Sequence, residues 1–132
     1  MAQVNDQRPL AASAKNLAVA LNSTGLTTLI EMVIPEAARR LGVSILPTVE
    51  NLNGLLVEAK FYRDAPYVTI SSALATTSTT PFMGVSATLA TLAAGSTGWF
   101  FMDVSGVYGV RVSAQAAAGT DGLCDAYASA NS

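Results

Sequence analysis

The feature that most constrains the fold is a strict alternation of apolar and polar residues over residues 108–116. One face of this segment carries Tyr108, Val110, Val112 and Ala114, and the other carries Gly109, Arg111, Ser113 and Gln115. A period of two predicts a β-strand that is buried on one side only. Small residues and two glycines then lead to a last short strand over 123–129. We therefore expect these two strands to form a hairpin at the end of the domain.

Six further segments have the composition of short strands, with turn residues between them. They are residues 26–34, 43–46, 55–63, 67–72, 85–89 and 99–102. Helical periodicity is almost absent from the chain. This pattern predicts an all-β fold, either an antiparallel β-sandwich or a jelly roll, with an immunoglobulin-like strand order as the alternative topology.

Segments 55–63 and 67–72 should pair as an antiparallel hairpin, because Asp64, Ala65 and Pro66 form a turn signal between them. In the first of these strands we expect inward and outward positions to alternate. The inward positions would be Leu55, Val57, Ala59 and Phe61, and the outward ones Leu56, Glu58, Lys60 and Tyr62. Segment 26–34 is apolar on both faces, which predicts a strand that is central in a covered sheet or lies at an interface.

The length of 132 residues suits one hydrophobic core. We expect a single β-sandwich domain over 25–132, preceded by an extended N-terminal arm over 1–24 that lies on a neighbour. An amphipathic helix is the alternative for the arm, since Leu10, Ala14, Leu17 and Leu21 have helical spacing, but an isolated short helix is marginal in water. The Thr- and Ala-rich segment 73–98 should hold a strand between two loops, or else be a long excursion that covers a neighbour.

Charged residues make up only 12% of the chain, and the net charge is −2. A neutral surface suits a protein that packs against other copies or a partner, although a soluble monomer with a Ser- and Thr-rich surface fits the composition as well. The sequence has no basic stripe and no apolar stretch of the ~20 residues that span a membrane, so we expect neither nucleic acid nor membrane as a partner. The start, MAQVNDQRPL, lacks a hydrophobic signal core, which predicts a cytoplasmic product or one released by lysis.

The residue types exclude most catalytic chemistry. The chain has no histidine and one cysteine, so it cannot form a Ser-His or Cys-His nucleophile or a cysteine-based zinc site. Paired carboxylates, as in glycosidases, are the remaining catalytic option. The candidates are Glu31, Glu36, Glu50, Glu58, Asp64, Asp103, Asp121 and Asp125. We expect these groups to have structural roles, and hence no enzyme activity, no cofactor and no metal site.

Several of these carboxylates have simple structural explanations. Glu58 should form a charge ladder with Lys60 on the outer face of its strand. Asp103 follows an aromatic run and should cap a turn. Asp121 and Asp125 flank the last hairpin, with too few oxygen ligands for calcium.

Most aromatic residues occupy alternating apolar positions, which predicts core packing for Trp99, Phe100, Phe101, Tyr67 and Tyr108. Cys124 is expected to be a small buried thiol. Tyr62 is the exception, because it lies between charged residues and should contact a ligand or another subunit. Further candidate partner contacts come from the strand over 26–33 and from the arginine doublet in the loop that follows it. The full set is Leu29, Glu31, Val33, Arg39, Arg40 and Tyr62.

The segment GWFFMDVSGVYGVRVSAQAAAGTDG and the terminal YASA resemble the end of small β-sandwich virion structural proteins of tailed bacteriophages, of the capsid decoration (cement) type. The similarity covers residues 95–130. It implies a homo-oligomeric protein of the virion, made in the host cytoplasm, that binds the major capsid protein or other virion proteins and stabilises the outer capsid lattice. The alternative is a carbohydrate-binding or tail- or fibre-associated β-sandwich module that uses Tyr62 or the loops of 73–98.

Overall fold

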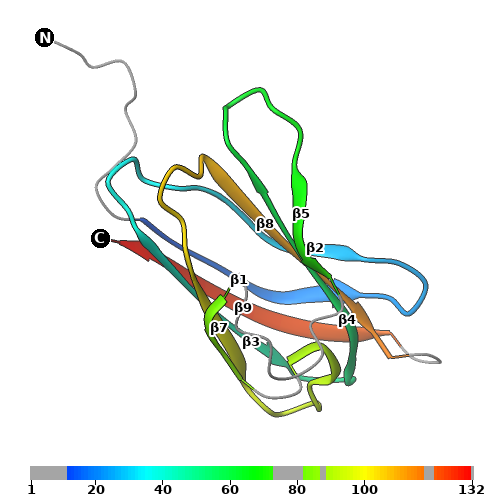
Figure 1. The fold of residues 1–132 in the computed structure, drawn as a ribbon. Helices are drawn as coiled ribbons and strands as arrows, with labels where there is room; N and C mark the ends of the chain where they lie inside the picture. Colours follow the sequence, from blue (N-terminus) through cyan, green and yellow to red (C-terminus); the bar gives the residue numbers. More distant parts are fainter. Residues whose placement is uncertain (1–11, 73–81, 87–88, 118–120, 132) are drawn as a thin grey trace, which may run out of the picture.

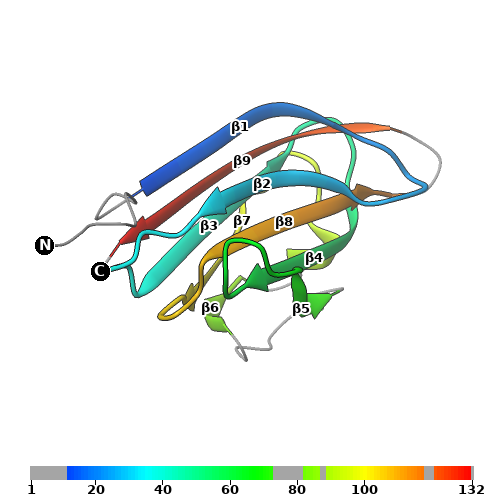
Figure 2. The ribbon, with the colours of Figure 1, turned by 90° about the horizontal axis from the view of Figure 1, so that it is seen from above.

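The computed structural model describes residues 12–72, 82–86, 89–117 and 121–131, and within these residues nine strands form two packed antiparallel sheets (Figure 1). The five-stranded sheet has the order β1 (Ala12–Leu21), β9 (Gly122–Asn131), β3 (Arg40–Pro47), β7 (Gly98–Asp103) and β6 (Phe82–Val85). The four-stranded sheet has the order β2 (Thr27–Val33), β8 (Gly109–Ala116), β4 (Leu52–Lys60) and β5 (Val68–Ser72). Seen from above, one sheet lies over the other (Figure 2). The predicted all-β sandwich is confirmed.

The core lies between the two layers. Three of the inward positions predicted for residues 108–116 are confirmed, because Val110, Val112 and Ala114 of β8 are buried, whereas Tyr108 precedes the strand and is half-buried. The largest completely buried side chains come from both sheets and their connections: Phe100, Leu29, Ile34, Leu41, Ile45 and Leu55. Each large apolar side chain buried in this way stabilises the fold by roughly 1.5–3 kcal/mol relative to an exposed position. Cys124 is buried in the same core, as predicted.

The hairpin predicted between 55–63 and 67–72 is confirmed by the antiparallel pairing of β4 with β5. The hairpin predicted at the end of the domain is wrong. β8 pairs with β2 and β4 in one sheet, whereas β9 lies between β1 and β3 in the other. Alternation shows that each strand is buried on one face, but it does not show which sheet supplies the partners, and in the second sheet β9 has hydrogen-bonded neighbours on both sides.

Residues 12–21 of the predicted arm belong to the sandwich, as β1 along the edge of the five-stranded sheet. They are neither a helix nor an arm on a neighbour, so the domain includes them, and residues 1–11 lie outside the described part. A bulge between Asn16 and Val19 interrupts the alternation, and Ala18 there has a φ of 54°. The Ala18 N–H donates a hydrogen bond of 2.8 Å to Asp125 Oδ1, which holds this left-handed conformation in place. The bulge interrupts the inward–outward alternation of side chains along β1. The apolar residues of this strand therefore have spacings that resemble those of a helix.

The strand predicted at 85–89 is displaced. β6 occupies Phe82–Val85 and pairs with β7, and a short 3-10 helix, η1, occupies Leu89–Thr91. The remainder of the proposed loops, 73–81 and 87–88, lies outside the described residues. The turn of η1 approaches β7 closely at Gly98, where a Cβ atom would lie 2.6 Å from Leu89 Cδ1 and 2.9 Å from Leu92 Cδ2.

We predict that Gly98→Ala lowers the free energy of unfolding by about 1–3 kcal/mol, because buried Leu89 and Leu92 must move to admit the methyl group. Gly42→Ala on the adjacent strand β3 is the matched control, since a Cβ there meets nothing within 4 Å. Urea denaturation of both variants measures the difference. Equal midpoints for the two substitutions would show that the contact of η1 with β7 is not tightly packed.

Candidate functional site

The described residues contain no group of three or more histidine, cysteine, aspartate or glutamate side chains that could hold a metal ion. In the same part of the chain, no helix has the length and apolar character needed to cross a membrane. Asp103 caps a turn, as predicted: its Oδ1 accepts a hydrogen bond of 2.8 Å from the Ser105 N–H. This hydrogen bond lowers the pKa of the Asp103 carboxyl.

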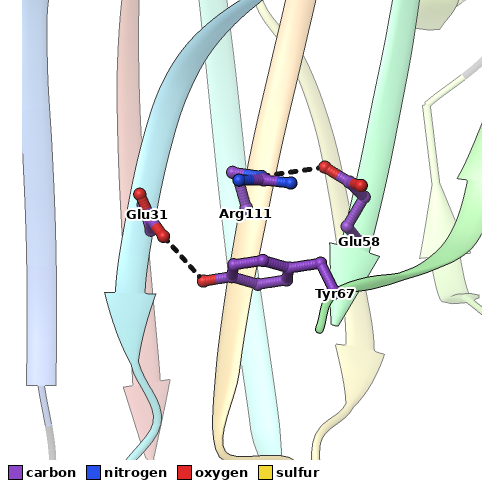
Figure 3. A network of polar contacts seen from close by, with 4 residues as sticks. All are labelled: Glu31, Glu58, Tyr67 and Arg111. Atoms are coloured by element: carbon purple, nitrogen blue, oxygen red, sulfur yellow. Dashed lines mark hydrogen bonds and ion pairs between the residues drawn. The ribbon is translucent and has the colours of Figure 1, made fainter. Parts of the chain in front are cut away.

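Four polar side chains form a connected network on the outer face of the four-stranded sheet (Figure 3). Arg111 Nε donates to Glu58 Oε1 over 2.8 Å, and the Tyr67 hydroxyl donates to Glu31 Oε2 over 2.9 Å. The Arg111 guanidinium lies 4.2 Å from the centroid of the Tyr67 ring, at cation–π distance. The network thus links β2, β8 and β4 to the residue that immediately precedes β5.

The partner of Glu58 differs from the prediction. Glu31, Arg111 and Glu58 occupy one row across β2, β8 and β4, so Arg111 is directly opposite both carboxylates. Directly opposite residues have Cβ atoms about 4.5–5.5 Å apart, whereas i and i+2 on one strand are separated by roughly 6.6 Å. Glu58 therefore pairs across the sheet with Arg111, and Lys60 is left to contact the aromatic rings of Tyr67 and Tyr108.

The network and Lys60 hold the turn between β4 and β5, which we call the hairpin tip (residues 61–66). Lys60 Nζ donates to the Arg63 carbonyl over 3.0 Å, and the Ala65 N–H donates to the Tyr62 carbonyl over 3.3 Å. Tyr67 anchors the other end of the tip through Glu31 on β2. Contacts on both sides of the turn therefore restrict its conformation.

The hairpin tip exposes two aromatic side chains. Tyr62 is 76% exposed, which confirms its predicted outward position, and Phe61 is 53% exposed. The inward position predicted for Phe61 is wrong, because β4 ends at Lys60 and the alternation does not continue into the turn. Two exposed aromatic side chains on a turn of restricted conformation are typical of a docking surface.

The structure also places the other predicted contact residues. Glu31, Val33, Arg39 and Arg40 lie at or near the same end of the sandwich as Tyr62, where β2 and β4 end and β3 begins (Figure 1). All four have exposed side chains, and their contact with a partner stays a prediction. Leu29, also a predicted partner contact, is completely buried in the core and is not accessible to a partner in this structure. The register shift between Thr28 and Ile30 turns both Leu29 and Ile30 into the core.

A second surface lies on the outer face of the five-stranded sheet. Trp99 and Phe101 project from β7 and Tyr127 projects from β9, on either side of β3, which contributes Gly42 and Ser44 between them. We call this hollow the aromatic groove, and its volume is about 340 Å³. The rings of Trp99 and Phe101 are stacked, with centroids 5.7 Å apart and an angle of 12° between their planes.

Sequence reasoning missed this groove. Core packing was predicted for Trp99 and Phe101, but Trp99 is 42% exposed and Phe101 is half-buried, while Phe100 and Met102 point inward. Tyr127, for which the sequence suggested no role, is 43% exposed. The signal was present in the run 99–102, because a strand with four consecutive apolar residues must direct two of them outward.

No protein-family model and no curated protein matches this chain. Among solved structures, the SPBc2 prophage-derived protein YomS is similar, with 18% identity and a TM-score of 0.51, covering 95% of this chain and 99% of that one. The cyanophage Pam1 capsid asymmetric unit is more distant, with 17% identity and a TM-score of 0.36 over 98% of this chain and 90% of that one. The likeness to YomS extends over nearly the whole of both chains and concerns the fold.

We predict that Tyr67→Phe removes a phenol ionisation at about pH 12, because burial and the hydrogen bond to Glu31 raise the pKa of Tyr67 to about 12 from its ordinary value of 10.0. Spectrophotometric titration in the near ultraviolet measures this step among the four tyrosines. Since the pKa of Tyr67 is raised in the folded state, its protonated hydroxyl stabilises the fold below about pH 10, and this stabilisation is lost as the pH rises through 12. Tyr62→Phe is the control and should keep the step at about pH 12; loss of that step in the control instead would contradict the network.

Proposed function

We propose that this protein is a structural subunit of a phage virion, of the decoration type, which attaches to the outside of the capsid through the hairpin tip. The observation that carries the proposal is the pair Phe61 and Tyr62, exposed on a turn that Lys60 and the Tyr67 network hold in one conformation. Exposed aromatic side chains favour burial against a partner. A turn that is already ordered loses little further conformational entropy when it binds.

Charge around the tip supports docking onto a protein surface. Arg63 and Asp64 directly follow the two aromatic residues and are exposed, so charged groups of both signs lie beside a small apolar centre. An apolar centre with a polar rim is the usual composition of a specific protein interface. The proposed partners are the major capsid protein or other virion proteins, and the role involves no catalysis.

The fold agrees with this role. YomS, a prophage-derived protein, has a similar fold over nearly the whole of both chains. We interpret the order β1-β9-β3-β7 opposite β2-β8-β4-β5 as a jelly roll, with β6 added at one edge. Jelly rolls are frequent among viral capsid proteins. A homo-oligomeric subunit with one tip in each copy would also gain avidity from a lattice that repeats the binding site.

We predict that the double variant Phe61→Ser, Tyr62→Ser binds capsids of its own phage at least roughly 30-fold more weakly, the effect of losing a contact worth about 2 kcal/mol at the centre of an interface. Co-sedimentation of the purified protein with undecorated capsids measures occupancy. Val49→Ser is the control, because Val49 is equally apolar and exposed but lies in the turn between β3 and β4 at the opposite end.

Far-ultraviolet circular dichroism should show that the double variant and the control both retain the sandwich. Unchanged occupancy of the folded double variant, or equal losses in the double variant and the control, would count against docking through the tip. Light scattering of the free protein tests the homo-oligomer separately.

A further inference from the structure

We propose that the aromatic groove is a binding site for an uncharged oligosaccharide, whose sugar rings stack against Trp99 and Tyr127. The two rings lie in one row across the sheet, because Ser44 is opposite Trp99 on one side and Tyr127 on the other. One strand separates them, so the walls of the groove are roughly 10 Å apart, twice the spacing of adjacent strands. A six-membered sugar ring fits this width with a face against an aromatic ring, and the C–H groups of that face meet the negative π surface.

The wall on β7 is preformed. The stacked rings of Trp99 and Phe101 lie over Gly84 of β6, where a Cβ atom would be 2.7 Å from Phe101 Cζ and 3.3 Å from Trp99 Cζ3. Gly84 therefore allows the two rings to lie close against the edge strand. A wall held in this way needs no rearrangement before a ligand binds, as is usual for small-molecule sites.

The floor of the groove consists of small residues, two of which carry hydroxyl groups. Gly42 has no side chain, and the Ser44 hydroxyl has no hydrogen-bond partner among the described residues. Ser129 contributes a second hydroxyl, which accepts a long hydrogen bond of 3.5 Å from the Asn131 side chain. Hydroxyl groups both donate and accept, which matches the hydroxyl groups of a sugar lying above them.

The groove continues into a neighbouring hollow of about 240 Å³ that shares Gly42, Phe101 and Ser129 with it and adds Arg40 and Asn131. Two adjoining hollows offer more space than one sugar ring fills, which favours an oligosaccharide over a monosaccharide. Arg40 is the one charged residue among the described residues that line the two hollows, and the aromatic groove between Trp99 and Tyr127 has none, so the stacking part of the site favours uncharged sugar rings.

The same features favour a sugar over a second copy of this chain. A protein face packed on this sheet would need apolar side chains to interdigitate with, whereas the floor between the aromatic walls is Gly42 and Ser44. Self-association is nevertheless a distinct outcome of the test, because a second copy would also cover Trp99.

Trp99 is the only tryptophan of the chain, so its fluorescence reports on this groove alone. We expect titration with maltohexaose, cellohexaose or chitohexaose to produce a saturable change in Trp99 emission with at least one of the three. Gly42→Val should weaken this response about tenfold or more, because a Cβ atom there meets nothing within 4 Å, so the new side chain occupies the open groove, and valine suits a strand.

Gly54→Val is the matched control and should keep the response, since it makes the same substitution in β4 of the other sheet with only ordinary contact to Gln115. Tyr127→Ala is a second test variant that removes one wall without adding volume, should Gly42→Val fail to fold. The proposal is overturned if none of the three sugars changes the emission, or if the change persists in the groove variants. It is overturned as well if Trp99 emission depends on protein concentration and light scattering shows a dimer that Gly42→Val dissociates.

Discussion

Packing of the inner faces of the two sheets against each other is the interaction on which the rest of this structure depends. The chain has few charged groups and one cysteine, which is buried and unpaired, so its stability comes from apolar side chains such as Phe100, Ile45 and Val112 meeting between the layers. That packing uses one face of each strand. The turns and the two outer faces are then the parts of the described protein that remain available for partners.

The two outer faces differ in chemistry although they belong to sheets of similar size. The face of the four-stranded sheet is polar and carries an ion pair and a tyrosine–carboxylate hydrogen bond that cross three strands. The face of the five-stranded sheet is aromatic along β7 and β9 and small along β3. The first arrangement immobilises a turn, whereas the second leaves a groove, so the two faces suit different kinds of contact.

Both surfaces are preorganised, and by different means. The hairpin tip is held by directional polar contacts from Lys60 and Tyr67, which weaken if a charge is lost. The wall of the aromatic groove is held by van der Waals contact with Gly84, which depends only on shape. A virion subunit that combines a docking turn with a separate sugar-binding groove would attach to a particle through one surface and present the other outward. The two proposed functions use separate residues, because the hairpin tip (residues 61–66) and the lining of the aromatic groove do not overlap.

The alternation and turn signals of the sequence were sufficient to predict an all-β sandwich, the β4–β5 hairpin, the buried thiol of Cys124 and the exposure of Tyr62. These features depend on neighbours in the chain, and a period of two or a proline in a turn encodes them directly. The lack of histidine likewise restricts the candidate chemistry through composition alone.

Tertiary structure alone decided which strands are partners and which face of an apolar strand is buried. β8 and β9 are neighbours in sequence but lie in different sheets, and Trp99 points outward while Phe100 points inward although both are large and apolar. Bulges in β1 and β2 changed the phase of the alternation, which moved Leu29 into the core and hid a strand within residues 12–21. The physical reason is that alternation specifies only the relative orientation of adjacent residues. The absolute orientation of a strand, its partners and the grooves between its side chains are set when the two sheets pack together.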